Sequence, residues 1–344
     1  MSLSPKLRMS LDYTAQKHRQ GSSKWTYSPE RVEQCDGQGR DFVLGVVSTA
    51  QTRITRQAIF SQRRWCEMKA MNVSFIQPAK QLSPYVALMW IFESRSGVPL
   101  ADSRLIVPDG RAKIIVPYRN ALCAAVTTGL LSAQEHHIFL VGIQTHPTTI
   151  ASTATDTGTI GVELTPKGLY HLFKLSMHEI TDRMISFEEV FGPWGARLQT
   201  RVGDADDPLE KIILLQRALT HLLEQNEKEY ALLDHTLDLL VRTHGMISIQ
   251  ELAAHLGYTR RYVDRLFQEH VGVSPKSLAS ILRFQEVYQG WMRHRSASFF
   301  RTQWPAYYYD QSHFIKEFKR FTGFTPQQYT AIVNEFGRAF HTKQ

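Results

Sequence analysis

The 344-residue sequence has few cysteines and no long apolar run. Its three cysteines, Cys35, Cys66 and Cys123, cannot all pair with one another, and none lies in a Cys-x-x-Cys spacing. This argues against a disulfide-stabilised scaffold and a cysteine-built zinc site, and is typical of a reducing compartment. No stretch approaches the roughly 18 uncharged apolar residues of a membrane-spanning helix, so no membrane contact is expected. The N-terminus lacks the apolar segment of a secretory signal, which predicts a cytoplasmic protein.

Composition and charge indicate a folded chain with a basic C-terminal part. Hydrophobic residues make up 43% of the sequence and charged residues 21%, which argues against global disorder. At roughly 100–200 residues per domain, the length predicts two domains. Residues 246–344 contain 13 Lys or Arg against 7 Asp or Glu, whereas residues 1–245 contain 27 against 25. This excess fits either a module that binds a polyanion or a solvated basic surface, and charge alone does not separate the two.

The N-terminal half is predicted to be β-rich. Residues 1–40 are polar and basic and are expected to form a weakly ordered arm. Residues 41–207 hold short apolar and β-branched runs separated by Gly, Pro, Asp and Asn, a pattern typical of a β-barrel or sandwich. These runs are DFVLGVV (41–47), NVSFIQP (72–78), YVALMWIFE (85–93), SRLIVPDG (103–110), AKIIVPY (112–118) and HIFLVGIQT (137–145). Short helices and turns are expected over 166–195, ending at Phe191-Gly192-Pro193-Trp194-Gly195.

Two helices are predicted over 208–244. Asp207 and Pro208 form a helix start, because an N-cap acid precedes a proline at the first helical position. Apolar residues then recur at helical spacing in 209–223 and in 232–241. The first helix, over 208–230, is a connector whose apolar face either forms a homodimer seam or packs within one chain.

The segment ISIQELAAHLGYTRRYVDRLFQEHVGVSP (247–275) predicts a helix-turn-helix. Ser248 and Glu251 form a capping box that starts a helix at 249, and Gly257 ends that helix. Thr259 can cap a second helix, whose buried face is Val263, Leu266 and Phe267. The outward face of this second helix presents side chains suited to base edges and phosphates: Arg260, Arg261, Tyr262, Asp264 and Arg265.

The same pattern recurs 51 residues later in the chain. RLFQEHVGVSP (265–275) and KEFKRFTGFTP (316–326) align, so that Phe267 matches Phe318 and Gly272 matches Gly323. An apolar helix is predicted between the two units, over roughly 276–294. At about 1.5 Å per residue it separates the units by about 30 Å, close to the roughly 34 Å repeat of the major groove.

Residues 231–338 resemble the DNA-binding domain of AraC/XylS-type transcription regulators. The resemblance is carried by the first helix-turn-helix, by Leu282-Arg283-Phe284 in the linker helix and by YYDQSHFIKEFKRFTGFTPQQY (308–329). It implies an α+β protein in which an all-α DNA-binding domain, over 231–344, follows the β-rich one. PYVALMWIFES (84–94), RLIVPDGRAKIIV (104–116) and GVELTPKGLYHLFKLSMHEITDRMISFEEVFG (161–192) also resemble a sensor-like N-terminal domain often fused to such domains.

The resemblance implies a sequence-specific regulator that binds double-stranded DNA and is tuned through its N-terminal domain by an effector or partner of unknown identity. RNA polymerase, a small-molecule effector and a homodimer are further implied partners, with no cofactor. The candidate DNA-binding residues are Thr259, Arg260, Arg261, Tyr262, Asp264, Arg265, Gln311, Ser312, His313 and Lys316. For Tyr262 and His313, partial packing or a phosphate contact fits equally well.

The second unit departs from the family pattern just before its recognition helix. Where the family has a small residue and, four positions on, a glycine, this sequence has Gln303 and Tyr307, with Trp304-Pro305 between them. Proline inside a helix costs about 3 kcal/mol, and Gln303 is too bulky for a close helix crossing. We therefore expect a distorted or loosely anchored second unit with weaker, more tolerant readout.

The sequence gives little support for a metal site or a catalytic site. The spacing of metal ligands is absent from Glu135-His136-His137 and His146. Asp109 precedes Gly110, a pair that is typical of a turn. No nucleophile–base pair can be identified from the sequence. We expect no catalytic residue and no metal. Two alternatives stay open: a β-barrel enzyme or small-molecule binder whose C-terminal module is regulatory, and a degenerate family member that binds a protein through Trp304-Pro305 and residues 307–309.

Overall fold

A computed structural model describes residues 71–95, 105–126, 129–152, 154–226, 230–294, 299, 302 and 304–331 of the protein. The predicted arm over 1–40, the predicted strand over 41–47 and Gln303 lie outside these residues.

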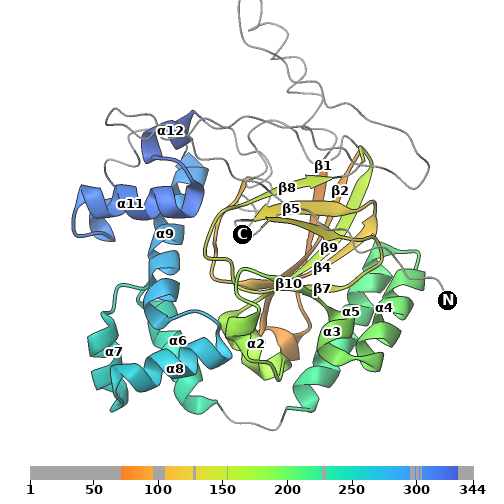
Figure 1. Cartoon of the computed structure of the whole chain (residues 1–344), viewed down its shortest axis with the longest axis horizontal. Coiled ribbons are helices and arrows are strands. Elements are labelled where there is room, and N and C mark those ends of the chain that lie inside the picture. The colour runs from red at the N-terminus through yellow and green to blue at the C-terminus, as the bar shows by residue number, and fades with distance from the viewer. Residues whose placement is uncertain are drawn as a thin grey trace, which may run out of the picture. The chain divides into compact units, whose positions relative to one another are not determined.

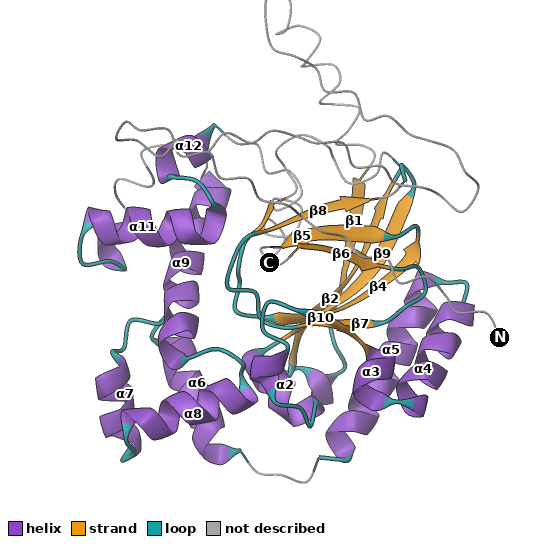
Figure 2. Ribbon diagram, viewed as in Figure 1, coloured by secondary structure: helices purple, strands orange, loops and turns teal. Residues whose placement is uncertain are grey.

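Two antiparallel sheets form the N-terminal part of the described chain (Figures 1 and 2). The larger sheet has the order β1 (Met71–Ile76), β2 (Val86–Ser94), β9 (Thr157–Leu164), β4 (Ala112–Arg119), β7 (Phe139–Val141) and β10 (Met184–Ser186). The smaller sheet has the order β3 (Leu105–Ile106), β8 (Thr148–Ser152), β5 (Leu122–Val126) and β6 (Gly129–Ala133). Within the described residues the two sheets do not join into one closed barrel, so the β-rich prediction is confirmed in its sandwich-like form.

The central strand of the larger sheet, β9, is not among the runs that predict strands. It pairs with β2 on one side and β4 on the other, and all eight of its residues are buried. Gly161 lies under the Trp90 ring, where a Cβ atom would come within 2.0 Å of the indole. Glycine is therefore required in the middle of β9, because the neighbouring strand already fills the space above it.

Helices cover the sheets and lead into the C-terminal part. They are η1 (Lys80–Leu82), α2 (Pro166–Leu172), η2 (Met177–Glu179), α3 (Phe187–Phe191), α4 (Pro193–Asp204) and α5 (Pro208–Glu224). Pro193, expected in a terminal turn, instead begins α4, because proline fits the first helical position. As predicted, Asp207 caps α5, which packs against α4, α2 and η1. The apolar face of α5 is thus used within the chain, although Leu209 and Ile213 stay exposed.

The C-terminal part contains two helical units joined by one long helix. Its elements are α6 (Ala231–Arg242), α7 (Ile249–Leu256), α8 (Arg260–His270), α9 (Pro275–His294), η3 (Trp304–Ala306), α11 (Gln311–Thr322) and α12 (Pro326–Thr330). In Figure 1, α7 and α8 lie near one end of α9, and α11 and α12 lie near the other. This is the order of elements that the repeated sequence pattern predicts.

Arg283 on α9 links the two units. Its Nη1 donates to the Gly245 carbonyl oxygen at 2.7 Å, in the turn before α7. Its Nη2 lies 3.8 Å from Glu317 Oε1 on α11. One guanidinium on the linker helix therefore contacts both the entry to the first unit and the recognition helix of the second.

The first unit also contacts the β-rich part. Tyr170 of α2 donates to Asp234 Oδ1 of α6 at 2.5 Å, and His171 Nε2 lies 3.1 Å from the same oxygen. Burial and the Asp234 carboxylate raise the pKa of Tyr170 well above its ordinary value, so the phenol remains a donor. Thr181, just after η2, donates to the Gly272 carbonyl at 2.8 Å, where α8 has ended. The first recognition helix is thus held against the β-rich part from both α6 and η2.

Gly272 and Gly323 offer a matched test of that contact, because they occupy equivalent places in the two units. Both have positive φ, 90° and 80°, so alanine at either position adds roughly 1–2 kcal/mol of left-handed strain. A Cβ atom on Gly272 would also lie 2.6 Å from the Met177 carbonyl oxygen, whereas one on Gly323 meets nothing within 4 Å. Gly272→Ala should lower the free energy of unfolding by roughly 1–3 kcal/mol more than Gly323→Ala in urea titrations. Equal losses would contradict the close approach of η2.

Arg283→Leu should lower the free energy of unfolding by about 1.5–3 kcal/mol, because a charge-assisted hydrogen bond is lost and Glu317 keeps a largely buried carboxylate. Arg293→Leu, on the exposed face of the same helix, is the matched control and should change stability by less than about 0.5 kcal/mol. Thermal unfolding of both variants measures the difference. Similar small shifts would show that Arg283 does not join the units.

Candidate nucleic-acid interface

The first helix-turn-helix forms where the sequence predicts it. Ser248 Oγ accepts from the Glu251 amide at 3.1 Å, and Glu251 Oε2 accepts from the Ser248 amide at 3.0 Å, which completes the capping box of α7. Gly257 ends α7 with a φ of 69°. Thr259 Oγ1 then accepts from the Tyr262 amide at 3.3 Å and caps α8. The Thr259 hydroxyl therefore serves as the N-cap that positions α8. Thr259 is also one of the candidate DNA-binding residues.

The two faces of α8 differ as expected. Val263 and Phe267 are buried, Leu266 is half-buried, and Arg260, Arg261 and Arg265 are exposed. Tyr262 lies between these faces: its ring stacks on Tyr258, with centroids 4.9 Å apart, and the Arg265 guanidinium carbon lies 5.4 Å from its centroid. This stack restricts the Arg265 side chain before any ligand arrives.

Charge on α8 is partly balanced within the helix. Arg260 Nε lies 3.7 Å from Asp264 Oδ2, one helical turn on. Across the described part of the chain, no carboxylate forms an ion pair with Arg261 or Arg265. These two guanidinium groups are therefore the cations of α8 that can neutralise an external anion.

The second recognition helix, α11, has the same construction. Asp310 Oδ1 accepts from the His313 amide at 2.8 Å and caps the helix. Its inner face buries Phe314, Phe318 and Phe321. The candidates Gln311, Ser312, His313 and Lys316 are all exposed on its first turns. His313 is partly engaged, because its Nε2 lies 3.7 Å from Glu317 Oε1 and its ring meets Tyr308 edge-on at 5.3 Å.

The segment before α11 is broken at Trp304-Pro305, as the proline predicts. Residues Trp304–Ala306 form the short 3-10 helix η3. The Trp304 ring stacks on Phe314 with centroids 6.1 Å apart and planes 8° apart, and the buried Tyr308 lies 5.3 Å from the same ring. The short helix η3 is the distortion that the sequence predicts, and aromatic contacts pack this segment against α11. Weaker readout by this unit stays a prediction.

Several exposed residues beside the recognition helices are not among the DNA-binding residues predicted from the sequence. Tyr258 precedes the cap of α8, Tyr309 precedes that of α11 and is 97% exposed, and Lys319 and Arg320 extend the basic face of α11. The run Tyr307-Tyr308-Tyr309 was visible in the sequence. Helical periodicity does not apply in such a connection, so the pattern could not tell the buried tyrosine from the exposed one.

The histidines considered as metal ligands are used in other ways. His146 Nδ1 lies 3.7 Å from Asp182 Oδ2, whereas His136 Nε2 lies 3.6 Å from its neighbour Glu135. Among the residues described, no group of three His, Cys, Asp or Glu side chains is arranged to hold a metal ion. A search of the same residues found no helix with the length and apolarity needed to cross a membrane.

Two domain families match the chain. A helix-turn-helix domain matches residues 252–332, which span α7 to α12 together with both sets of candidate residues. A domain of unknown function, DUF6597, matches residues 74–186, which make up most of the β-rich part. No curated protein matches the sequence.

The solved structures that the chain resembles are distant from it in sequence. ToxT from Vibrio cholerae is 12% identical, with 76% of this chain and 98% of that chain covered and a TM-score of 0.39. The AraC-like transcriptional activator CuxR is 11% identical, with coverages of 66% and 90% and a TM-score of 0.24. A cupin domain from Bordetella pertussis is 9% identical, with coverages of 28% and 94% and a TM-score of 0.21. These scores are too low to carry residue roles across.

The resemblance to a family of known function is therefore carried by the C-terminal part of the chain. The matched helix-turn-helix domain contains two capped recognition helices, the linker helix with Leu282-Arg283-Phe284 and the segment 308–329 that carries the family resemblance. The chain therefore contains, over residues 252–332, an AraC-type helix-turn-helix domain, the kind of domain that binds DNA in transcriptional regulators, and a β-rich domain precedes it.

Proposed function

We propose that the chain binds a specific duplex site by placing α8 and α11 in successive major grooves. The observation that carries this proposal is their common construction at the two ends of α9. Each helix has a side-chain N-cap, a buried aromatic inner face and exposed polar side chains on its first turns. The 20 residues of α9 span about 30 Å, close to the roughly 34 Å between successive major grooves.

The roles of the individual side chains follow from their chemistry. Arg261 and Arg265 have forked donors that match the two acceptors of a guanine edge, and Gln311 can pair with an adenine edge. Lys316 and Ser312 suit phosphate oxygens, and each neutralised phosphate releases counterions. Tyr258 and Tyr309 are exposed beside the two caps, where an aromatic hydroxyl can meet the sugar–phosphate backbone.

The β-rich domain is proposed to tune this binding through an effector or a partner. Such control requires an effector that binds two arrangements of the domains with different affinities. Because the target is DNA, we place this activity in the cytoplasm. RNA polymerase and a second copy of the chain remain predicted partners, and the exposed Leu209 and Ile213 on α5 support the second of these.

The protein-binding alternative loses part of its basis. Two of the aromatic residues that suggested it, Trp304 and Tyr308, pack against Phe314. Tyr307 is half-buried against the core, so Tyr309 is the exposed residue of that run.

Arg265→Ala should weaken binding by about 1–3 kcal/mol and relax the preference at one base pair. The assay is fluorescence anisotropy with the duplex selected by the full-length protein and with its single-base variants. Arg201→Ala, on the exposed surface of α4, removes the same charge away from α8 and should leave binding nearly unchanged. An equal loss on every duplex would make Arg265 a phosphate contact, and no loss would remove α8 from the interface.

Gln311→Ala should weaken binding less than Arg265→Ala in the same assay, because Gln311 is the base-reading side chain of the second unit, whose readout of sequence is predicted to be weaker. The half-site bound by α11 should also tolerate base changes better than the half-site bound by α8. A loss equal to or larger than that of Arg265→Ala would show that the aromatic packing of Trp304 fully replaces the family's close helix crossing.

A further inference from the structure

The ring of Tyr262 on α8 contacts an aromatic and a cationic side chain of its own unit. It stacks on Tyr258 with centroids 4.9 Å apart and planes 20° apart, and the guanidinium carbon of Arg265 lies 5.4 Å from its centroid. Tyr258, Tyr262 and Arg265 thus form a stacked column beside the start of α8. Its last member, Arg265, is exposed on the outward face of the helix.

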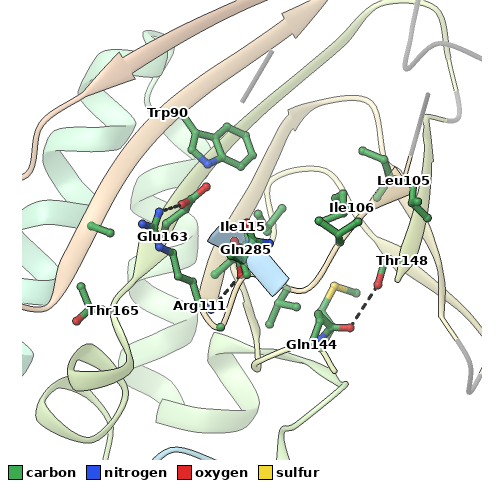
Figure 3. Close-up of a pocket in the computed structure, with 18 of the residues that line it drawn as sticks. Trp90, Leu105, Ile106, Arg111, Ile115, Gln144, Thr148, Glu163, Thr165 and Gln285 are labelled. Atoms are coloured by element: carbon green, nitrogen blue, oxygen red, sulfur yellow. Dashed lines mark hydrogen bonds and ion pairs between the residues drawn. The ribbon is translucent and has the colours of Figure 1, made fainter. Parts of the chain in front are cut away.

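Arg265 is held by a ring, whereas two other arginines of the protein are held by hydrogen-bond acceptors. Arg111, in the wall of a cavity of the β-rich domain, donates to Glu163 Oε2 at 2.6 Å, as Figure 3 shows. Arg283 of α9 donates to the Gly245 carbonyl oxygen at 2.7 Å. Each of these bonds occupies a guanidinium donor, but a ring face attracts the cation without occupying one. The forked donors of Arg265 therefore stay available for a base edge while its side chain is restrained.

The second unit lacks such a column at the matching positions. A shift of 51 residues matches Tyr258, Tyr262 and Arg265 with Tyr309, His313 and Lys316, respectively. The ring of His313 meets Tyr308 edge-on, and its Nε2 lies 3.7 Å from Glu317 Oε1. Tyr309 is 97% exposed, and among the described residues no ring stacks on it and none lies over the Lys316 ammonium group. The second unit thus has the first ring of the column but neither the second ring nor the arginine.

Restraint of an arginine side chain favours strict readout of a base. A long flexible side chain loses rotamer freedom when it binds, and this loss lowers affinity. A guanidinium group that is already held in one orientation loses less freedom. It also presents its two donors in a fixed direction, which disfavours a base without matching acceptors.

We propose that Tyr262 is a positioning residue that holds Arg265 for the readout of one base pair, and that the absence of this column weakens readout by the second unit. Tyr262 acts through its ring and through Arg265, and not through a contact between its hydroxyl and DNA. The readout step rests on the proposed function, whereas the restraint of Arg265 exists without DNA.

The restraint can be measured in the full-length protein without DNA. Nitrogen relaxation of the arginine Nε–H groups gives an order parameter for each assigned guanidinium group. Arg265 should have a higher value than Arg261, which is exposed on the same helix and, within the described chain, has neither a ring nor a carboxylate as partner. Tyr262→Leu should lower the Arg265 value to that of Arg261, and Tyr262→Phe should leave it unchanged. Equal values for the two arginines in the unaltered protein would overturn the proposal.

The same variants test the readout of sequence. The measured quantity is the ratio of affinities for the selected duplex and for the duplex changed at the base pair where Arg265→Ala relaxes the preference. This ratio does not depend on the fraction of folded protein, so a loss of stability does not affect it. Tyr262→Leu should reduce the ratio by about twofold to fivefold, the size of a cation–π contact at an exposed site, and Tyr262→Phe should retain it. Equal reductions in both variants would assign the effect to the hydroxyl and overturn the positioning role.

Combination with Arg265→Ala shows whether Tyr262 acts through Arg265. In that background Tyr262→Leu should cause no further reduction of the ratio, because the ring has no guanidinium group left to hold. A further reduction as large as in the unaltered background would contradict action through Arg265.

His313→Tyr combined with Lys316→Arg builds the column on α11, where Tyr309 is already present. This variant should discriminate between bases in the half-site of α11 about twofold to fivefold better than Lys316→Arg alone. His313→Leu combined with Lys316→Arg is the matched control, because it also removes the contact with Glu317 but adds no aromatic ring. Equal discrimination by the two combined variants would refute the proposed difference between the units.

Failure of this proposal is distinguishable from failure of the proposed function. Absence of any duplex preference in the unaltered protein would refute the proposed function and, with it, the readout step. Specific duplex binding that Tyr262→Leu leaves unchanged would refute the positioning role alone.

Discussion

The linker helix α9 is the element on which the rest of the structure depends. Within three residues, Arg283 contacts Gly245 and Glu317 of the two helical units, and Gln285 contacts Pro108 of the β-rich domain. Side chains on one helix therefore contact three parts of the chain. A change in the position of α9 relative to one part must be accommodated by the other two, because packed interfaces shift between discrete arrangements and do not deform continuously.

The two recognition helices are held in different ways. The end of α8 is fixed to the β-rich domain by Thr181 and, through α6, by Asp234, whereas α11 packs against α9, α12 and η3. The first unit therefore has the more direct contact with the β-rich domain, and α9 connects it to the second unit. This arrangement gives a physical route by which one domain could alter the spacing or orientation of two DNA-reading helices, since only a difference between states changes affinity.

Local features were predictable from the sequence, and features made by distant residues were not. The caps at Ser248, Thr259 and Asp207 depend on neighbours three residues away or fewer, and all three form. Strand β9 was missed because its glycines and small residues suit it only under the rings of adjacent strands. Asp109 does make the predicted turn contact, accepting from the Arg111 amide, but its pairing with Lys113 beside a cavity depends on the sheet. The helix break at Trp304-Pro305 could be predicted because proline disrupts the helix in which it lies. The stacking of Trp304 on Phe314 could not, because it depends on the tertiary packing of α11.

The central claim is that one α9 helix holds both recognition helices at a fixed separation, and half-site spacing tests it most directly. Affinity would be measured for a series of duplexes in which the two half-sites are moved apart by up to about ten base pairs, one full helical turn. A rigid linker predicts a single optimum spacing, with affinity falling to that of one half-site both at a half-turn and at a full-turn insertion. Recovery of full affinity at the full-turn insertion would contradict the claim, because the two half-sites would then be bound by units that α9 does not hold together.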